Sequence, residues 1–168
     1  MKLWFKQRFF SWFDSYDIYY EDGSVAYTVK GQFSWGHCLH ILDASGGHIA
    51  TLWEDVSSLL ARFEVYVGEE YVGNIQREAT FLRPHYDIDY NGWQVDGDLF
   101  AWDYTVKSQE GTVIASISKE FCGATDAYSI RLEDPQNALW VLLLVLAIDA
   151  DKCTRGAGRL WFLPRPFR

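Results

Sequence analysis

The sequence predicts a mainly β protein, in which a closed antiparallel barrel of about twelve strands wraps around one hydrophobic C-terminal helix. Three observations lead to this fold class. Most of the chain consists of short segments rich in Val, Ile, Tyr and Trp, separated by turn sequences. One uninterrupted apolar run, ALWVLLLVLAI, follows them near the C-terminus. The part of the chain before that run also resembles itself at an interval of about 70 residues.

The predicted strands are short, and several alternate between apolar and polar residues, as in RFEVYV. Turn sequences such as EDGS, DASGG, NGW and QEG separate them. Short strands at this spacing are typical of a barrel or a sandwich. The expected strands are Leu3–Gln7, Tyr16–Tyr20, Val25–Lys30, Cys38–Leu42, His48–Trp53, Arg62–Val67, Tyr71–Arg77, Tyr86–Tyr90, Trp93–Gly97, Tyr104–Ser108, Thr112–Ser118 and Tyr128–Leu132.

The apolar run Ala138–Ile148 predicts a buried helix and not a membrane span. A span requires ~20 apolar residues, whereas runs of about 10–14 are typical of core helices. Asp134 supplies an N-cap and Pro135 suits the first helical position, so we expect a helix from about Pro135 to Asp151. Because this helix is apolar on every face, it must be enclosed on every side. A barrel with the helix in its lumen meets that requirement.

Two six-residue segments carry the internal repeat, SYDIYY at Ser15–Tyr20 and HYDIDY at His85–Tyr90. Weaker matches follow each of them, and the offset drifts from about 70 to about 65 residues, as changes in loop length would produce. The repeat predicts a duplicated half of about six strands, followed by the helix. Repeats of this kind report on fold and not on chemistry.

Composition narrows the class of protein. A chain of 168 residues that is 49% hydrophobic fits a single domain with a sizeable core. A formal charge of -8 and a pI near 4.9 argue against a nucleic-acid binder, whose footprint is basic. Three scattered cysteines are not a disulfide framework, and the N-terminal segment does not read as a signal peptide. We therefore expect a cytoplasmic protein with free thiols.

Five segments, taken together, indicate a family. They are KQRFFSW at Lys6–Trp12, YDIDYNGWQVDGD at Tyr86–Asp98, DYTV at Asp103–Val106, IASISKE at Ile114–Glu120 and LVLAID at Leu144–Asp149. With these segments the chain resembles the bacterial branch of the LURP-one-related family, in the superfamily of the tubby C-terminal domain. The resemblance runs from about Leu3 to Lys152 and implies a twelve-stranded barrel around a central C-terminal helix.

The resemblance implies a binding protein and not an enzyme, because bacterial members offer no catalytic motif to transfer. Relatives in the superfamily include phosphoinositide-binding tubby domains and phospholipid scramblases. The segment KEFCGATDAY departs from the family pattern, and the C-terminal RGAGRLWFLPRPFR lies outside it. We therefore expect a barrel domain at residues 1–152, a basic aromatic tail at 153–168, and no cofactor.

Candidates for chemistry are few, and a structural role is the better interpretation of each. His37, Cys38 and His40 lie close together, but on a strand His37 points away from the other two, and no second ligand pair has metal-site spacing. Two carboxylate pairs flank predicted turns, where solvated strand ends explain them. We expect no metal site and no catalytic residue. The carboxylate pairs are Asp87 with Asp89 and Asp96 with Asp98.

Both ends of the chain are basic and aromatic, although the middle is strongly acidic. Five basic residues and no acid follow Asp151. Basic residues interleaved with aromatic ones suit an anionic membrane surface, where each contributes about 1 kcal/mol near the headgroups. The candidate ligand-binding or lipid-binding residues are Arg155, Arg159, Trp161, Phe162, Arg165 and Arg168.

Two functions stay open at this point. The first is a non-enzymatic binding module that holds phospholipid headgroups or another anionic ligand at its surface, peripheral to a membrane. The second is a structural or protein-interaction domain that docks a protein partner through the barrel surface and the aromatic tail. A lumen filled by the helix leaves little room for a ligand, so any ligand site is expected outside the barrel.

Overall fold

The computed structural model of the chain describes residues 1–6, 15–32, 34–80, 83–122 and 125–161. For residues 6, 121–122, 125–126 and 155–161 it describes the backbone alone.

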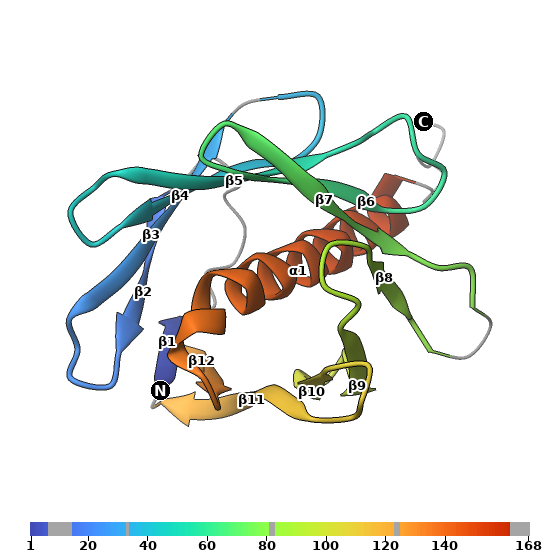
Figure 1. Cartoon of the computed structure of the whole chain (residues 1–168). Helices are drawn as coiled ribbons and strands as arrows, with labels where there is room; N and C mark the ends of the chain where they lie inside the picture. Colours follow the sequence, from blue (N-terminus) through green and yellow to red (C-terminus); the bar gives the residue numbers. More distant parts are fainter. Residues whose placement is uncertain (7–14, 33, 81–82, 123–124, 162–168) are drawn as a thin grey trace, which may run out of the picture.

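Twelve strands form one antiparallel sheet, and every expected strand is present (Figure 1). The sheet order is β8-β7-β6-β5-β4-β3-β2-β1-β12-β11-β10-β9. The bounds are β1 Lys2–Lys6, β2 Ser15–Tyr20, β3 Val25–Gln32, β4 Cys38–Asp43, β5 His48–Glu54, β6 Arg62–Val67, β7 Glu70–Arg77, β8 Tyr86–Ile88, β9 Gln94–Asp98, β10 Asp103–Lys107, β11 Val113–Cys122 and β12 Thr125–Leu132.

The barrel is nearly closed, in agreement with the twelve-stranded antiparallel barrel expected from the sequence. β1 pairs with both β2 and β12, so it joins the two halves of the sheet. β8 and β9 are the outer strands of the order, and no ladder joins them among the described residues. β8 ends at Ile88 and not at Tyr90 because the chain turns there. The Gly92 amide donates to the Ile88 carbonyl at 3.0 Å, and Gly92 has a φ of 65°.

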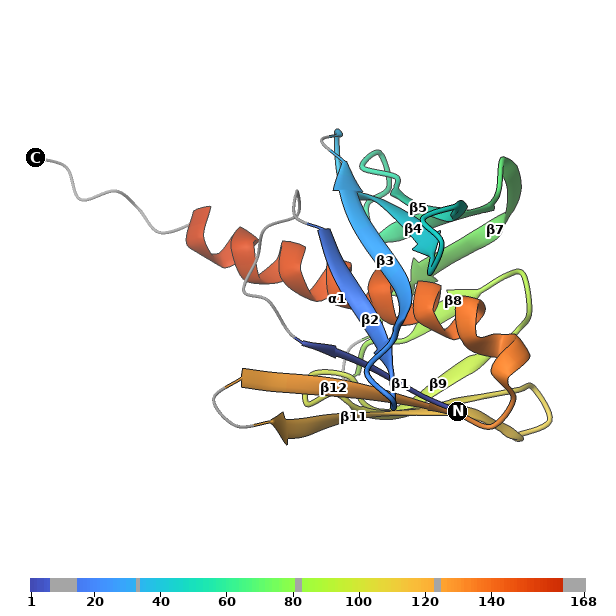
Figure 2. The same ribbon diagram turned by 90° about the vertical axis from the view of Figure 1, so that its left-hand side faces the viewer.

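The C-terminal helix begins where the sequence predicts and ends later. A 3-10 turn, η1 (Pro135–Asn137), leads into α1 (Ala138–Trp161), and the Asp134 side chain accepts a hydrogen bond from the Gln136 amide at 2.9 Å. The expected end was about Asp151. The residues from Asp151 to Trp161 include no proline, so every backbone N–H there is available for helix hydrogen bonds and the helix can continue. Figure 2 shows the last turns of α1 extending beyond the strands.

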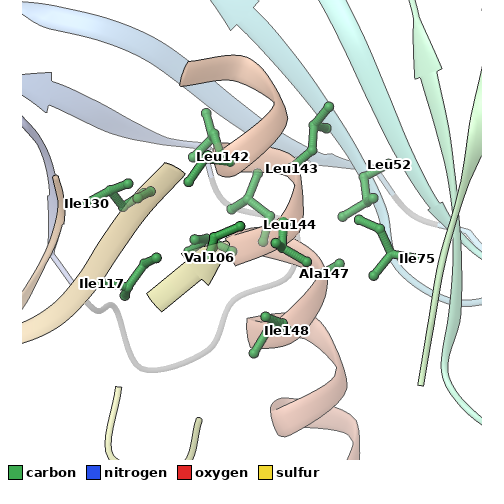
Figure 3. Close-up of a cluster of buried hydrophobic side chains, with 14 of the residues drawn as sticks. Leu52, Ile75, Val106, Ile117, Ile130, Leu142, Leu143, Leu144, Ala147 and Ile148 are labelled. Carbon is green, nitrogen blue, oxygen red and sulfur yellow. The ribbon is translucent and has the colours of Figure 1, made fainter. Parts of the chain in front are cut away.

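The core lies between α1 and the barrel wall. Helix residues 141–148 are at most 2% exposed. Leu142 and Leu144 lie between opposite walls of the barrel in Figure 3, with Ile130 on one side and Leu52 on the other. Each fully buried side chain of this size stabilises the fold by ~1.5–3 kcal/mol relative to exposure. The barrel therefore needs the helix as its core, as the all-round apolar run predicts.

The connections between strands alternate between the two ends of the barrel, because every ladder is antiparallel. α1 enters at the end that also holds the N-terminus, where the Met1 amino group donates to the Leu132 carbonyl at 2.9 Å. We name this the entry end; its connections fall within residues 21–24, 43–47, 67–70, 89–93, 108–112 and 133–137. We name the opposite end, where α1 leaves, the exit end; its described connections fall within residues 34–37, 55–61, 78–80, 83–85 and 99–102.

Candidate functional site

The exit end presents large apolar side chains to solvent. Trp35, Val56, Leu59 and Phe100 are 89%, 59%, 100% and 62% exposed, and all four lie in exit-end connections. Several exposed apolar side chains gathered on one face of a folded protein mark a contact surface more often than scattered ones do. We refer to these four residues as the exit-end apolar tips.

Two of the exit-end connections pack closely against each other. Gly36, next to Trp35, has a φ of 101°, and a Cβ at this position would lie 2.5 Å from Val56 Cγ1. Only glycine permits this approach. His37 Nδ1 lies 2.5 Å from Glu54 Oε2, and the Glu54 amide donates to the His37 carbonyl at 2.7 Å. Burial alone would raise the pKa of Glu54, but the hydrogen bonds from His37 outweigh it and hold that pKa below its usual value.

A lysine of α1 fixes the connection that carries Phe100. Lys152 Nζ donates to the Leu99 carbonyl at 2.7 Å and to the Phe100 carbonyl at 3.2 Å, and lies 4.3 Å from the ring centroid of Trp102. Trp102 itself has a φ of 57°, and its ring packs on Tyr128 with centroids 4.3 Å apart. The aromatic packing and the lysine together hold the β9–β10 connection against the helix.

Below the exit end, α1 places one carboxylate deep in the barrel. Asp151 is 3% exposed and accepts a hydrogen bond from the Tyr86 hydroxyl at 2.5 Å. Arg77 Nη1, from the end of β7, lies 4.0 Å from the other carboxylate oxygen. Buried charges are tolerated when they are paired and hydrogen-bonded in this way.

A second helix carboxylate, Asp149, lies among barrel tyrosines. Burial raises the pKa of Asp149 to about 6, although the charges of Lys152 and His37 oppose the shift. Burial raises the pKa of Tyr16 and Tyr104, and the neighbouring Asp149 charge raises both further. Asp149 is therefore a carboxyl that gains its proton close to neutral pH, at the point where α1 leaves the barrel.

The six tail residues singled out from the sequence divide into two sets. Arg155, Arg159 and Trp161 lie in the last turns of α1, where the backbone alone is described, so the helix carries them away from the barrel at its exit end. Phe162, Arg165 and Arg168 lie outside the described residues. The boundary expected at 152/153 falls inside α1.

The entry end has the opposite character, since its connections contain acids and no Lys or Arg. Several of these acids organise their own turns; Asp43 Oδ1, for example, accepts hydrogen bonds from the Ser45 and Gly47 amides. The acids of this end are Glu21, Asp22, Asp43, Glu69, Glu70, Asp89, Glu110, Glu133 and Asp134.

Three of the four carboxylates weighed as catalytic candidates hold structural positions, and the fourth, Asp87, is exposed on β8. Asp89 accepts hydrogen bonds from the Asn74 amide at 2.7 Å and from its side chain at 2.6 Å. Asp96 pairs with Lys107 at 2.8 Å, and this contact lowers the Asp96 pKa. Asp98 accepts hydrogen bonds from two backbone amides of the β9–β10 connection. These contacts occupy the carboxylate oxygens in turns and strand pairs.

Cys38 and His40 share the outer face of β4, whereas His37 turns to Glu54, as the strand periodicity predicts. Burial raises the pKa of the Cys38 thiol, which therefore stays protonated and is a poor nucleophile. Within the described part of the chain, no group of three or more His, Cys, Asp and Glu side chains is placed to hold a metal ion.

Sequence reasoning missed the exit-end apolar tips because each stands alone between two predicted strands. A usable signal was nevertheless present. Alternate connections of an antiparallel meander lie at the same end, and alternate connections of this chain are acidic. The intervening ones carry Trp35, Leu59 and Phe100.

Across the ranges that the structure describes, no helix combines the length and apolar character that a membrane crossing requires.

Comparison with known proteins agrees with the architecture. The chain is 29% identical over 150 residues to the uncharacterized protein YxjI of Bacillus subtilis (strain 168), covering 89% of this chain and 92% of that one. Its fold is similar to the X-ray structure of a protein from Arabidopsis thaliana, with a TM-score of 0.59 and 14% identity over 88% of this chain and 90% of that one. The family model described as LURP-one-related matches residues 1–149. The chain therefore belongs to the LURP-one-related family.

Proposed function

We propose that the protein is a non-enzymatic module that attaches peripherally to an anionic membrane surface through its exit end. The observation that carries the proposal is the segregation of side chains along the barrel axis. Exposed apolar side chains gather at the exit end, and the connections of the entry end are acidic without a compensating base. An anionic lipid surface can bury the exposed apolar side chains of the exit end, and it repels the acidic connections of the entry end.

Apolar burial supplies part of the attraction. Trp35 and Leu59 stand 89% and 100% exposed, so little of either side chain is already used in the fold. Tryptophan is enriched at membrane–water interfaces, because its ring is apolar and its N–H is polar. Fully burying a side chain of this size contributes ~1.5–3 kcal/mol, and partial insertion among headgroups contributes less.

Basic residues supply the other part. α1 leaves the barrel at the exit end and carries Arg155 and Arg159 in its last turns. Each such charge contributes about 1 kcal/mol near an anionic leaflet. Arginine also forms bidentate contacts with phosphate oxygens. Phe162, Arg165 and Arg168 extend the same basic and aromatic pattern in sequence. The cytoplasmic leaflet, which is anionic, is the surface that this combination fits.

Co-sedimentation with vesicles tests the proposal. The protein should bind vesicles of phosphatidylcholine mixed with phosphatidylserine, and bind vesicles of phosphatidylcholine alone weakly. Binding should fall as salt rises above ~0.1 M, where the screening length shortens to ~10 Å. Trp35→Ser combined with Leu59→Ser should weaken binding, and truncation after Gly156 should weaken it separately.

Tyr71→Ser is the matched control, because Tyr71 is an exposed aromatic near the entry end, 47% exposed. It should bind as the wild type does. The proposal fails if the wild type ignores acidic vesicles, or if the Tyr71 variant loses as much binding as the exit-end variant. Unchanged melting temperatures establish that each variant is folded.

A further inference from the structure

A pocket of about 410 Å³ lies on the outer face of the barrel, over β3 to β6. It lies outside the lumen on the barrel wall, and its lining reaches Ser34 of an exit-end connection and Glu69 of an entry-end connection. Two histidines from neighbouring strands face each other in it. The lining includes Gln32, Cys38, His40, His48, Thr51 and Trp53.

A β-bulge brings the two histidines together. β4 pairs with β5 so that His40 is opposite Thr51, and the register shifts before Leu42 reaches His48. Because His48 and Thr51 are three residues apart, a regular strand would direct them to opposite faces. The bulge adds one residue between them, and both side chains then point outward.

Three donor atoms form a small triangle on this face. His40 Nδ1 lies 3.4 Å from His48 Nε2 and 3.1 Å from Thr51 Oγ1. His48 Nε2 lies 2.9 Å from the same oxygen. Around an ion with bonds of ~2.0–2.1 Å, two donors lie about 3.3 Å apart at the tetrahedral angle and about 2.9 Å apart at a right angle. The edges of the triangle match these separations.

The ring of His40 is already oriented for coordination through Nδ1. Its Nε2 lies 2.5 Å from Gln32 Oε1, an acceptor, so the proton belongs on Nε2 and the lone pair on Nδ1. A metal-bound histidine usually donates its other N–H in this way. Cys38 Sγ lies 3.8 Å from Nε2, on the far side of the ring from the triangle, and is not part of the donor set.

We propose that His40 Nδ1, His48 Nε2 and Thr51 Oγ1 bind one divalent ion of the late first-row transition metals, such as Zn²⁺, with water in the remaining positions. Imidazole nitrogen suits these ions, whereas Mg²⁺ and Ca²⁺ prefer oxygen. The open pocket leaves room for the waters. The proposal differs from the expectation of no metal site because the sequence alone does not show that His40 and His48 are neighbours; the strand register brings them together.

Isothermal titration calorimetry with ZnCl₂ tests the site on the full chain purified with a chelator and then dialysed. The wild type should take up one Zn²⁺, and both His48→Ala and His40→Ala should abolish that uptake. His85→Ala is the matched control, because His85 lies outside the pocket with 45% of its side chain exposed. It should bind as the wild type does. Excess Mg²⁺ should not compete.

His48 is exposed, so its removal leaves the fold intact, which an unchanged melting temperature verifies. No uptake by the wild type, or wild-type uptake by His48→Ala, overturns the proposal. Gln32→Ala separates orientation from coordination: loss of the Nε2–H acceptor should weaken Zn²⁺ binding by about 10-fold or more without abolishing it. Unchanged affinity in that variant overturns the Nδ1 assignment.

Discussion

Replacing Asp149 with asparagine should stabilise the protein at neutral pH. Asp149 lies where α1 leaves the barrel, next to Tyr16 and Tyr104. Burial raises its pKa to about 6 from the ordinary 3.8. The folded protein therefore holds the Asp149 proton more tightly than the unfolded chain does. The stabilisation that comes with this proton is fully present below about pH 4 and is lost as the pH rises through about 6.

The size of the effect follows from the shift. A rise of roughly 2 pKa units corresponds to about 3 kcal/mol at 1.36 kcal/mol per unit. Asp149 keeps some contact with solvent, so screening reduces the expected value to about 1–2 kcal/mol. Asparagine has the shape of the neutral acid and carries no charge. Asp149→Asn should thus be more stable than the wild type by about 1–2 kcal/mol at about pH 7.5, and equal to it near pH 4.

Urea unfolding at a series of pH values measures this difference. Asp87→Asn is the matched control, because Asp87 is an exposed acid on the barrel wall, and such changes usually stay within about 0.5 kcal/mol. If Asp149→Asn is no more stable than the wild type at neutral pH, or if its advantage does not shrink on acidification, Asp149 is not held in the environment described.

Three further substitutions probe the fold. Val145→Asp should prevent folding, because Val145 is 0% exposed and an unpaired carboxylate there costs several kcal/mol; circular dichroism of the purified variant checks this. Gly97→Ala should lower the unfolding free energy by about 2–4 kcal/mol, since its Cβ would lie 2.5 Å from a backbone oxygen at a φ of 131°, whereas Gly46→Ala, with open space around it, should cost about 1 kcal/mol. Tyr86→Phe should cost about 1–3 kcal/mol in thermal unfolding, because Asp151 loses a buried hydrogen bond.

The sequence was sufficient for the architecture because strand and helix patterns are local. The alternation in RFEVYV predicts a strand with one buried face, and the unbroken apolar run of α1 predicts a helix that is buried on every face. The ends of elements depend on more distant contacts. Lys152, just past the expected end of α1, donates to carbonyls of the β9–β10 connection, a contact between segments far apart in the sequence.

Contacts between side chains of different strands were harder to predict from the sequence. His40 and His48 become neighbours only through a bulge, which shifts the register at Leu42 and leaves no mark in the composition. The exit-end apolar tips could have been predicted from the sequence, because the order of antiparallel strands alone decides at which end of the barrel each connection lies. Trp35 and Leu59 nevertheless read as isolated residues until the antiparallel order joins them at one end.

The orientation of the barrel on a membrane tests the central claim most directly. An environment-sensitive fluorophore is attached at Leu59→Cys, at the exit end, or at Ser45→Cys, at the entry end, after replacement of the native cysteines. With vesicles that contain phosphatidylserine, emission from residue 59 should shift to the blue as the probe enters the lipid interface, and emission from residue 45 should stay unchanged. Equal shifts at both positions, or a shift at residue 45 alone, would contradict attachment through the exit end.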